Sequence, residues 1–448
     1  MDYKAEYKSK VVSFEEAAKH IKSGDFVGTA LALGAWSKEL VNAICSRYKE
    51  LDNVTLNDGL QMDPGIMLYD EEFLKEADGR INFCPGFGTA LIRQINSKKL
   101  SDLYTIQGTD AGRKLAEICD VWVTQVTPPN KHGFVNLGLT NMWTMDTIRY
   151  GKQSGRQRLT IGEVNDQQPV VYGENWHHVS EFDLFVEHPH PIKQFKRAVP
   201  GDKEETIAKY ILDLIDDGST IQMGIGTIPE AVIGHLETKN DLGVVSEMFP
   251  TGLPQLIEKG VVTNERKPFH KGVSIATFCL GDETMYDYVT ENPSCLFYPG
   301  SYTDNSAFIG QHPNFVALNM AVMVDLSGQI CSEGIGHKQI SSPGGQLDFQ
   351  MGAYQSKGGK AITVLTAARN INGKLVSSIV PELPPGTPVT VPRHYADYII
   401  TEYGVAHIRY KTRRQRAEAL IEIAHPDLRD ELRESVKRNF YPSNGGCA

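Results

Sequence analysis

The sequence predicts an α/β fold built from two similar open α/β domains with mainly parallel sheets. Segments rich in Val, Ile and Leu alternate with helix-like stretches along the chain, for example at 120–126, 315–326 and 360–366. Such alternation is typical of strand–helix–strand units, whose strands run parallel. Two passages, 17–34 and 211–226, repeat the same order of helix, extended segment and glycine turn. This similarity indicates that the two halves share a topology.

Composition narrows the class of protein. The chain has 448 residues, of which 41% are hydrophobic and 22% charged, which is typical of a globular protein of two or three domains. The net charge of −10 leaves no basic surplus to neutralise phosphates, so general nucleic-acid binding is not expected. The N-terminus is charged, and no run of about 18 apolar residues occurs, so neither secretion nor membrane insertion is predicted.

The cysteines point to a reducing compartment. They occur singly, without a CxxC pair, as expected for reduced thiols of a cytoplasmic protein. The seven are Cys45, Cys84, Cys119, Cys279, Cys295, Cys331 and Cys447.

The first half begins with a clear helix signal. Ser13 precedes two glutamates and Gly24 supplies a stop, which predicts a helix within 13–24. Further on, paired prolines in 127–138 predict an extended turn with a structural or a substrate-lining role. Asn165, Asp166 and Gln167 follow a short strand and are expected either to line a cleft or to cap a loop.

Four histidines between 162 and 192 do not predict a metal site. The HH and HPH patterns match neither the i, i+4 helical spacing nor a cysteine-paired zinc site. They are His177, His178, His188 and His190.

The join between the halves is expected at 188–206, where Pro, Gly and charge cluster. The predicted domains are therefore 1–200 and 201–448. The second begins with a helix at 205–218, where apolar residues recur at helical intervals.

The stretch from Gln222 to Met248 is the most informative part of the sequence. Gly224 and Gly226 follow a strand-like segment, and Pro229 stands where a helix would begin, so free backbone N–H groups should crowd this turn. Glu247 ends the next strand-like segment. Because ligands bind at the carboxyl ends of strands in open α/β sheets, we expect an anion-holding turn and an acid at one edge.

That combination suits acyl chemistry, in which the carboxylate attacks and the N–H groups stabilise the oxyanion. A plain solvated strand end is the alternative for Glu247. A nicotinamide site is only weakly supported, because GIGTIP is not GxGxxG.

A second glycine loop lies within 341–362. Gly344 and Gly345 allow close backbone approach, and Gln346 and Asp348 offer an amide and a carboxylate. A purely structural turn would explain the glycines but would not require the two polar side chains.

Together, these segments resemble the acetyl-CoA hydrolase/transferase branch of the class I coenzyme A transferases, above all the 4-hydroxybutyrate and butyryl-CoA:acetate enzymes. The resemblance covers nearly the whole chain. It rests on QMGIGTIPEAV, VVSEM, MYDYVTENP, VDLSGQICSEGIGHKQISSPGGQLDF, GAYQSKGGKAI, DYIITEYGVA and RAEALIEIAHPDLRDEL.

The resemblance implies a role for each site residue. Glu247 would be the catalytic nucleophile and would form a glutamyl-CoA thioester. The residues expected to bind CoA are Gln222, Met223, Gly224, Ile225, Gly226, Asn319, Met320, Ala321, Gly344, Gly345 and Gln346. CoA would be a substrate and covalent intermediate rather than a permanently bound cofactor, and no metal is expected.

The resulting expectation is an enzyme that moves CoA between a short-chain acyl-CoA and acetate or a similar carboxylate with ping-pong kinetics. An acyl-CoA hydrolase is the alternative, and a non-catalytic CoA-binding protein is a third hypothesis. The family also implies a homodimer or larger homo-oligomer. One departure from its relatives, GTALALGAWSKEL without the usual proline, falls in the half expected to sense the acid.

Overall fold

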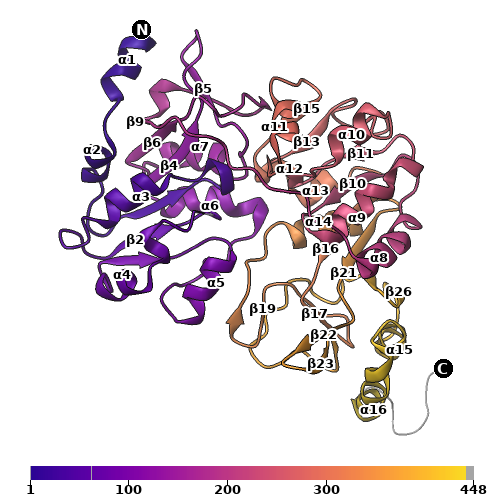
Figure 1. Ribbon diagram of the computed structural model, residues 1–448. Helices are drawn as coiled ribbons and strands as arrows, with labels where there is room; N and C mark the ends of the chain where they lie inside the picture. The colour runs from indigo at the N-terminus through magenta and orange to yellow at the C-terminus, as the bar shows by residue number, and fades with distance from the viewer. Residues whose placement is uncertain (1, 62, 440–448) are drawn as a thin grey trace. The chain divides into compact units, whose positions relative to one another are not determined.

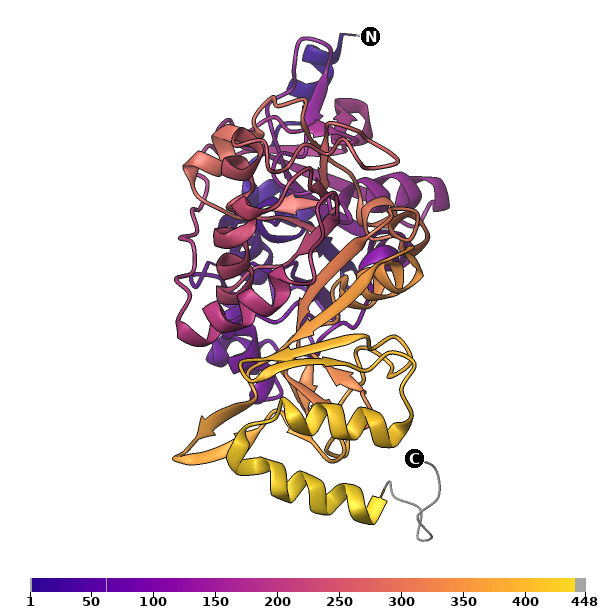
Figure 2. The same ribbon diagram turned by 90° about the vertical axis from the view of Figure 1, so that its right-hand side faces the viewer.

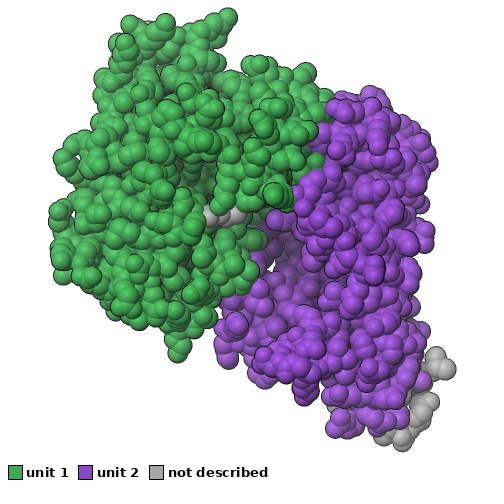
Figure 3. Space-filling model, viewed as in Figure 1, with its two compact units in different colours: residues 1–196, 247–251, 273–304 green, residues 197–246, 252–272, 305–448 purple. Residues whose placement is uncertain are grey.

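The computed structural model of the protein describes residues 2–61 and 63–439. The chain divides into two compact units, coloured separately in Figure 3. Unit 1 comprises residues 1–196, 247–251 and 273–304, and unit 2 comprises 197–246, 252–272 and 305–448. Each unit contains one six-stranded sheet with mainly parallel strands, which confirms the predicted fold class.

Unit 1 is built on a fully parallel sheet. Its strand order is β3-β2-β1-β4-β6-β9, and every pairing in it is parallel. All residues of β4 and β6 are buried, as expected of strands covered on both faces, including the polar Gln125 and the charged Glu163. The strands are β1 (Phe26–Thr29), β2 (Val54–Asn57), β3 (Ile81–Phe83), β4 (Val121–Val126), β6 (Leu159–Val164) and β9 (Leu184–Glu187).

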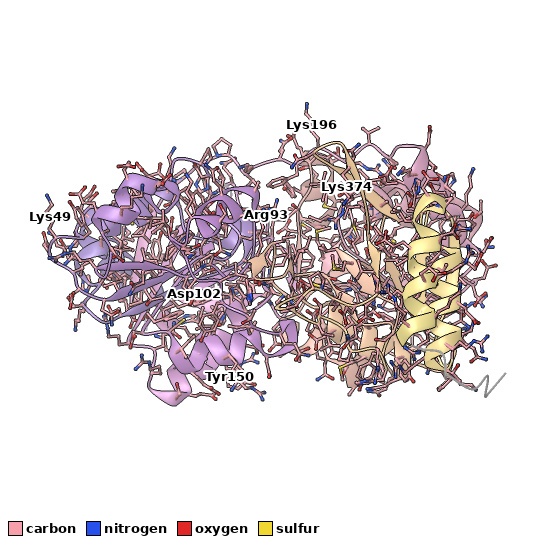
Figure 4. The ribbon with its side chains drawn as sticks, turned by 90° about the horizontal axis from the view of Figure 1, so that it is seen from below. Lys49, Arg93, Asp102, Tyr150, Lys196 and Lys374 are labelled. Atoms are coloured by element: carbon pink, nitrogen blue, oxygen red, sulfur yellow. The ribbon has the colours of Figure 1, made fainter. Side chains whose placement is uncertain are left out.

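Helices cover this sheet (Figure 1). Apolar residues of α2, α3, α4 and α5 share one core with the strands. The neighbouring helices α6 and α7 pack against each other, and Arg113 of α6 lies 5.1 Å from the ring centre of Tyr150 on α7, labelled in Figure 4. The helices are α1 (Tyr3–Lys10), α2 (Phe14–Lys19), α3 (Lys38–Cys45), α4 (Glu71–Glu76), α5 (Ala90–Ser97), α6 (Ala111–Ile118) and α7 (Thr144–Ser154).

The predicted helix at 13–24 is present as the shorter α2. The hydroxyl of Ser13 accepts a hydrogen bond from the backbone N–H of Glu16, as expected of an N-cap. The helix ends at Lys19, and Gly24 takes a left-handed conformation (φ +82°) in the following turn.

Smaller strands complete unit 1. β12 (Met248–Phe249) pairs with β14 (Phe278–Cys279), and a second small sheet has the order β13-β15-β7. The other elements are β5 (Phe134–Asn136), β7 (Tyr172–Gly173), β8 (Trp176–His178), β13 (Ser274–Ala276), β15 (Cys295–Phe297), α11 (Glu283–Val289) and α12 (Gly300–Thr303).

The sheet of unit 2 has the order β11-β10-β16-β21-β25-β26, parallel except for the final hairpin. Its strands are β10 (Thr220–Met223), β11 (Gly243–Val244), β16 (Phe315–Met320), β21 (Lys360–Val364), β25 (Tyr398–Thr401) and β26 (Gly404–His407). Its helices are α8 (Asp202–Leu212), α9 (Thr227–His235), α10 (Leu253–Glu258), α13 (Ser306–Ile309), α14 (Gln346–Gln355), α15 (Arg413–Glu422) and α16 (Arg429–Asn439).

A set of short β elements and the last two helices extend unit 2. Helices α15 and α16 run side by side (Figure 2) and share an apolar core with β25 and β26. The short strands are β17 (Met323–Asp325), β18 (Ile330–Cys331), β19 (Gly334–Ile335), β20 (Lys338–Gln339), β22 (Ala368–Ile371), β23 (Lys374–Ser377) and β24 (Ile379–Val380).

The two sheets repeat one strand order. Without the edge strands β3 and β26, the orders are β2-β1-β4-β6-β9 in unit 1 and β11-β10-β16-β21-β25 in unit 2. In each, the strand that comes first in the chain lies between the second and the third. The fourth and fifth strands follow on the side of the third. The predicted similarity of the two halves is therefore present as a shared topology.

The outer edge of β11 is covered at Val244 by side chains, directly after the main chain of 261–264 has bonded Leu242. The side-chain oxygen of Asn264 accepts from Val244 N (2.8 Å), and Lys267 Nζ donates to Val244 O (3.0 Å). Lys267 is buried, which lowers its pKa to about 7. These contacts fix the strand that leads to Glu247 and protect its edge from other strands.

Candidate active site

The turn after β10 presents unused hydrogen-bond donors. Among the described residues, the backbone N–H groups of Gly224, Ile225 and Gly226 have no acceptor. Gly226 has φ +127° and ψ −178°, a conformation open essentially to glycine alone, and it caps α9. Pro229 is the third residue of α9. The predicted donor-rich turn is present, and it is free to receive an anion.

Ser246 attaches the second strand to this turn. It is fully buried, and its hydroxyl lies 3.1 Å from the carbonyl oxygen and 3.4 Å from the backbone nitrogen of Met223. The residue before Glu247 therefore sits against the residue before Gly224.

Glu247 is the residue at which the chain passes from unit 2 into unit 1. It is partly exposed, whereas its neighbours Ser246 and Met248 are buried. Its carbonyl oxygen accepts hydrogen bonds from the backbone nitrogens of Thr277 (2.9 Å) and Phe278 (3.3 Å) and from the hydroxyl of Thr277 (2.6 Å). The main chain at the predicted nucleophile is thus held firmly.

The end of β16 lies next to the β10 turn. The side-chain amides of Gln222 and Asn319 bond each other in both directions, at 3.1 and 3.5 Å. A Cβ at Gly226 would come 3.5 Å from the sulfur of Met320. Met320 is 43% exposed and Ile225 58% exposed, so two apolar side chains border the open donors. Met223 is buried, and the backbone N–H of Ala321 is used by Val364 O.

The second glycine loop leads into α14. Gly344 has φ +57°, and Gly345 is the N-cap of α14. Ser356, just after α14, bonds the backbone N–H of Phe315 at the start of β16. Since the helix ends where β16 begins, its first residue lies toward the end of β16.

Gln346 carries an unsatisfied donor at that helix start. The side chain is only 7% exposed, and its amide nitrogen has no hydrogen-bond partner among the described residues. A buried amide without a partner is costly, so an acceptor from a ligand would be favourable there.

The predicted CoA-binding segments thus gather at the carboxyl ends of the unit 2 strands, where open α/β sheets bind ligands. They supply free N–H donors, an orphan amide and two exposed apolar side chains. This set can hold an anionic oxygen beside a chain that is part polar and part apolar.

The histidines of 162–192 have structural partners. His177 bonds Glu181 (2.9 Å), His178 caps a short 3-10 helix at 179–181, and the rings of His188 and His190 lie 4.5 Å apart. Within residues 2–61 and 63–439, no group of His, Cys, Asp or Glu could hold a metal ion. Asn165 accepts from the backbone N–H groups of Gln167 and His190, which favours the loop-cap interpretation.

Six of the seven cysteines lie in the described part of the chain, and all six are unbridged; Cys447 lies outside it. None of the described helices is long and apolar enough to cross a membrane.

Sequence reasoning missed a cavity of about 450 Å³ within unit 1. It opens where β1, β2 and β4 end. Its lining residues are Ala32, Leu33, Ser37, Lys38, Glu39, Gln61, Asp63, Pro64, Gln125, His188, His190, Pro191, Ile192 and Lys193. The signal in the sequence was Gln61, in the loop after β2, and Gln125, a polar residue within the buried strand β4.

Two buried acids support the turns around this cavity. Both oxygens of Glu163 accept from the backbone N–H of Ser37 (2.9 and 3.1 Å), and burial raises the pKa of Glu163 to about 7. Asp58 accepts from Tyr69 and from Gln61 N, and burial raises its pKa to about 6.

Known proteins match this chain over its length. The N-terminal domain of the acetyl-CoA hydrolase/transferase family matches residues 1–195, and its C-terminal domain matches 281–436. The 4-hydroxybutyrate coenzyme A transferase of Clostridium kluyveri is 38% identical over 446 residues, covering 98% of this chain and 100% of that protein.

Solved structures agree. RipA from Yersinia pestis has a TM-score of 0.87 at 32% identity, covering 98% of this chain and 99% of that one. A 4-hydroxybutyrate CoA-transferase from Porphyromonas gingivalis has a TM-score of 0.79 at 30% identity, covering 98% and 100%. These matches confirm the prediction of an enzyme of the CoA-transferase class. The chain therefore belongs to the acetyl-CoA hydrolase/transferase family, as the sequence predicts.

Proposed function

We propose that the protein transfers CoA between a short-chain acyl-CoA, such as butyryl-CoA or 4-hydroxybutyryl-CoA, and acetate or a similar carboxylate, with Glu247 as nucleophile. The observation that supports this proposal is the open turn Gly224–Gly226. Met223, directly before this turn, is hydrogen-bonded to Ser246, which directly precedes Glu247. A carboxylate and unused N–H donors are the two parts that acyl transfer needs.

The chemistry follows in balanced steps. An oxygen of Glu247 attacks the thioester carbonyl, the C–S bond breaks, and CoA leaves as a thiolate, which produces a mixed anhydride between the acyl group and Glu247. The thiolate attacks the glutamyl carbonyl, and the first acid leaves as carboxylate. A second carboxylate then attacks the glutamyl thioester, and the released thiolate attacks the new acyl group, which restores Glu247. Each tetrahedral oxyanion would be stabilised by donors of the β10 turn.

CoA would bind along the carboxyl edge of the unit 2 sheet. Ile225 and Met320 offer apolar contact for the aliphatic parts of pantetheine, and the orphan amide of Gln346 offers a donor for one of its carbonyl groups. Binding energy from these remote parts can be used to position the thioester at Glu247. Residues 201–448 would thus carry the CoA groove, and residues 1–200 would contact the acid.

The test follows the covalent intermediate. The protein is mixed with butyryl-CoA without acceptor, and intact mass and peptide mapping are used to look for CoA joined to Glu247. The Glu247→Gln variant should form no adduct and lose kcat by at least about 10⁴-fold, as loss of a nucleophile does. Glu283→Gln, at the exposed start of α11, is the control and should keep full activity.

Steady-state kinetics test the transfer itself. With acetate as acceptor, parallel double-reciprocal plots and formation of acetyl-CoA are expected. CoA release that ignores acetate would identify a hydrolase instead. Intersecting plots together with no adduct would refute the mechanism. Comparing kcat/KM over a panel of donors and acceptors assigns the substrate pair, and light scattering tests the expected homodimer or larger assembly.

A further inference from the structure

Thr277 bonds the main chain of the predicted nucleophile with its side chain as well as with its backbone. Its hydroxyl oxygen lies 2.6 Å from the carbonyl oxygen of Glu247, and its own backbone N–H donates to that same oxygen at 2.9 Å. With Phe278 N at 3.3 Å, three donors converge on one carbonyl. All of these residues belong to unit 1.

Thr277 is itself held rigidly. It is fully buried between β13 and β14, and its carbonyl accepts from the backbone N–H of Asn141 (2.8 Å). The next residue, Phe278, forms a bridge with Thr140 and pairs with Met248. The hydroxyl that reaches Glu247 therefore projects from a fixed support.

The consequence concerns the direction of the Glu247 side chain. A carbonyl with three donors cannot rotate without losing them, so the peptide after Glu247 is fixed, and with it the stem of the carboxylate. Catalytic groups need placement within about 0.5 Å, and a misplacement of about 1 Å can cost 10²-fold in rate. Without the Thr277 hydroxyl, the two backbone N–H groups would still bond the carbonyl of Glu247, but they would restrain it less.

We propose that Thr277 is a positioning residue for Glu247: its hydroxyl holds the nucleophile's main chain in the orientation from which the carboxylate attacks. This inference rests on the proposed function of Glu247. The competing explanation is that the hydroxyl only stabilises the contact between β12 and β14, in which case its loss would lower stability and leave the rate per folded molecule unchanged.

The experiment compares Thr277→Ser with Thr277→Ala. These two variants lack the same methyl group and differ only in the hydroxyl, so the ratio of their rates isolates the hydroxyl, whose nearer acceptor is Glu247 O (2.6 Å) and whose second is the sulfur of Met142 (3.2 Å). The single-turnover rate of CoA-adduct formation should fall about 10- to 100-fold in the alanine variant and stay within about 3-fold of wild type in the serine variant, as expected if the retained hydroxyl supplies the restraint. The KM for acyl-CoA should hardly change in either.

Thr401→Ala is the matched control. Thr401 is also fully buried, and its hydroxyl donates to a backbone carbonyl, that of Ile423 (2.5 Å), in unit 2. It should lower the Tm by a similar amount as Thr277→Ala and leave the adduct rate unchanged. Equal adduct rates for the serine and alanine variants would overturn the proposal.

A second measurement does not depend on catalysis. Peptide-resolved hydrogen exchange over 246–251 should be faster in Thr277→Ala than in Thr277→Ser. If wild type forms no adduct, the proposed function fails on its own account, and this comparison still decides whether Thr277 holds the Glu247 segment; equal exchange in the two variants would refute it.

Discussion

The turn after β1 in unit 1 and the turn after β10 in unit 2 occupy the same place in two sheets of the same strand order, yet they are built in opposite ways. In the β1 turn, residues 30–34 are at most 9% exposed, and Ala32 N donates to Gly59 O. In the β10 turn, Ile225 is 58% exposed, and a Cβ at Gly224 would meet no atom within 4 Å.

The difference shows which turn exposes its backbone N–H donors, since the β1 turn borders the unit 1 cavity with the side chains of Ala32 and Leu33 instead. Several polar groups of the β1 turn are bonded within the protein: Gln168 donates to Leu33 O, and Gln125 donates to Ala35 O. The β10 turn keeps its donors open among the described residues. The two sheets therefore share a topology, and the packing of each turn decides how far its backbone N–H donors are exposed to a ligand.

The largest expected effect is on the closed turn. In Gly59→Ala, the new Cβ would lie 2.1 Å from the backbone oxygen of Ala30, which cannot move without breaking the turn. We expect the free energy of unfolding to fall by at least about 3 kcal/mol. Urea unfolding followed by circular dichroism measures it. A loss below about 1 kcal/mol would show that the closed turn is more adaptable than its packing indicates.

The open turn should respond in activity rather than in stability. Gly224→Ala meets no atom within 4 Å and has no left-handed backbone, so unfolding free energy should stay within about 0.5 kcal/mol. If an acyl-CoA approaches this backbone, kcat/KM should fall by at least about 10-fold, equivalent to about 1.4 kcal/mol. Gly234→Ala, in α9 and equally uncrowded, is the control and should keep its activity. Full activity in Gly224→Ala would remove this residue from the site.

Glu163, which bonds the chain just after the closed turn, should make the free energy of unfolding depend on pH. Its pKa is raised from 4.5 to about 7 in the folded state, so the folded protein binds the proton more tightly than the unfolded chain. Its contribution to stability is present below about pH 4.5 and is lost as pH rises to about 7, a change on the order of 3 kcal/mol.

Replacing Glu163 tests this sign. Unfolding free energies of wild type and Glu163→Gln are compared between pH 4.5 and 8, and the decline in the wild type should be smaller in the variant. Glu72→Gln, at an exposed position of α4, serves as the control and should leave the profile unchanged. A profile for Glu163→Gln that runs parallel to that of the wild type would show that burial does not raise the pKa of this carboxyl.

The smallest expected effect concerns backbone strain. Ala32 has φ +51°, a left-handed conformation that costs a non-glycine residue about 1 kcal/mol. Ala32→Gly relieves this strain, but the added entropy of the unfolded chain lowers the free energy of unfolding by a similar amount, so the net change should be within about 0.5 kcal/mol. Gly226→Ala, at φ +127°, should instead lower the free energy of unfolding by about 1–3 kcal/mol. Equal losses in thermal unfolding would contradict this difference.

The sequence predictions that succeed are those that depend on interactions between residues close in the chain. The cap at Ser13, the glycine turn before α9 and the alternation of strands and helices depend on residues close in the chain, and each is present. The helix at 13–24 was expected to reach further than Lys19, because helix ends depend on packing as well as on local signals. The roles of Glu247 and of the CoA-binding residues stay predictions.

By itself, the sequence determined the α/β class, the repeated topology, the family and the glycine turn after a strand, since local patterns and long irregular motifs encode all of these. Only the tertiary structure decided that the carbonyl of Glu247 is bonded to Thr277, 30 positions on. It also decided that the β10 turn stays open while the β1 turn is filled, and that Glu163 is buried against Ser37. The physical reason is that strand register and long-range packing choose these contacts, and no local propensity encodes them.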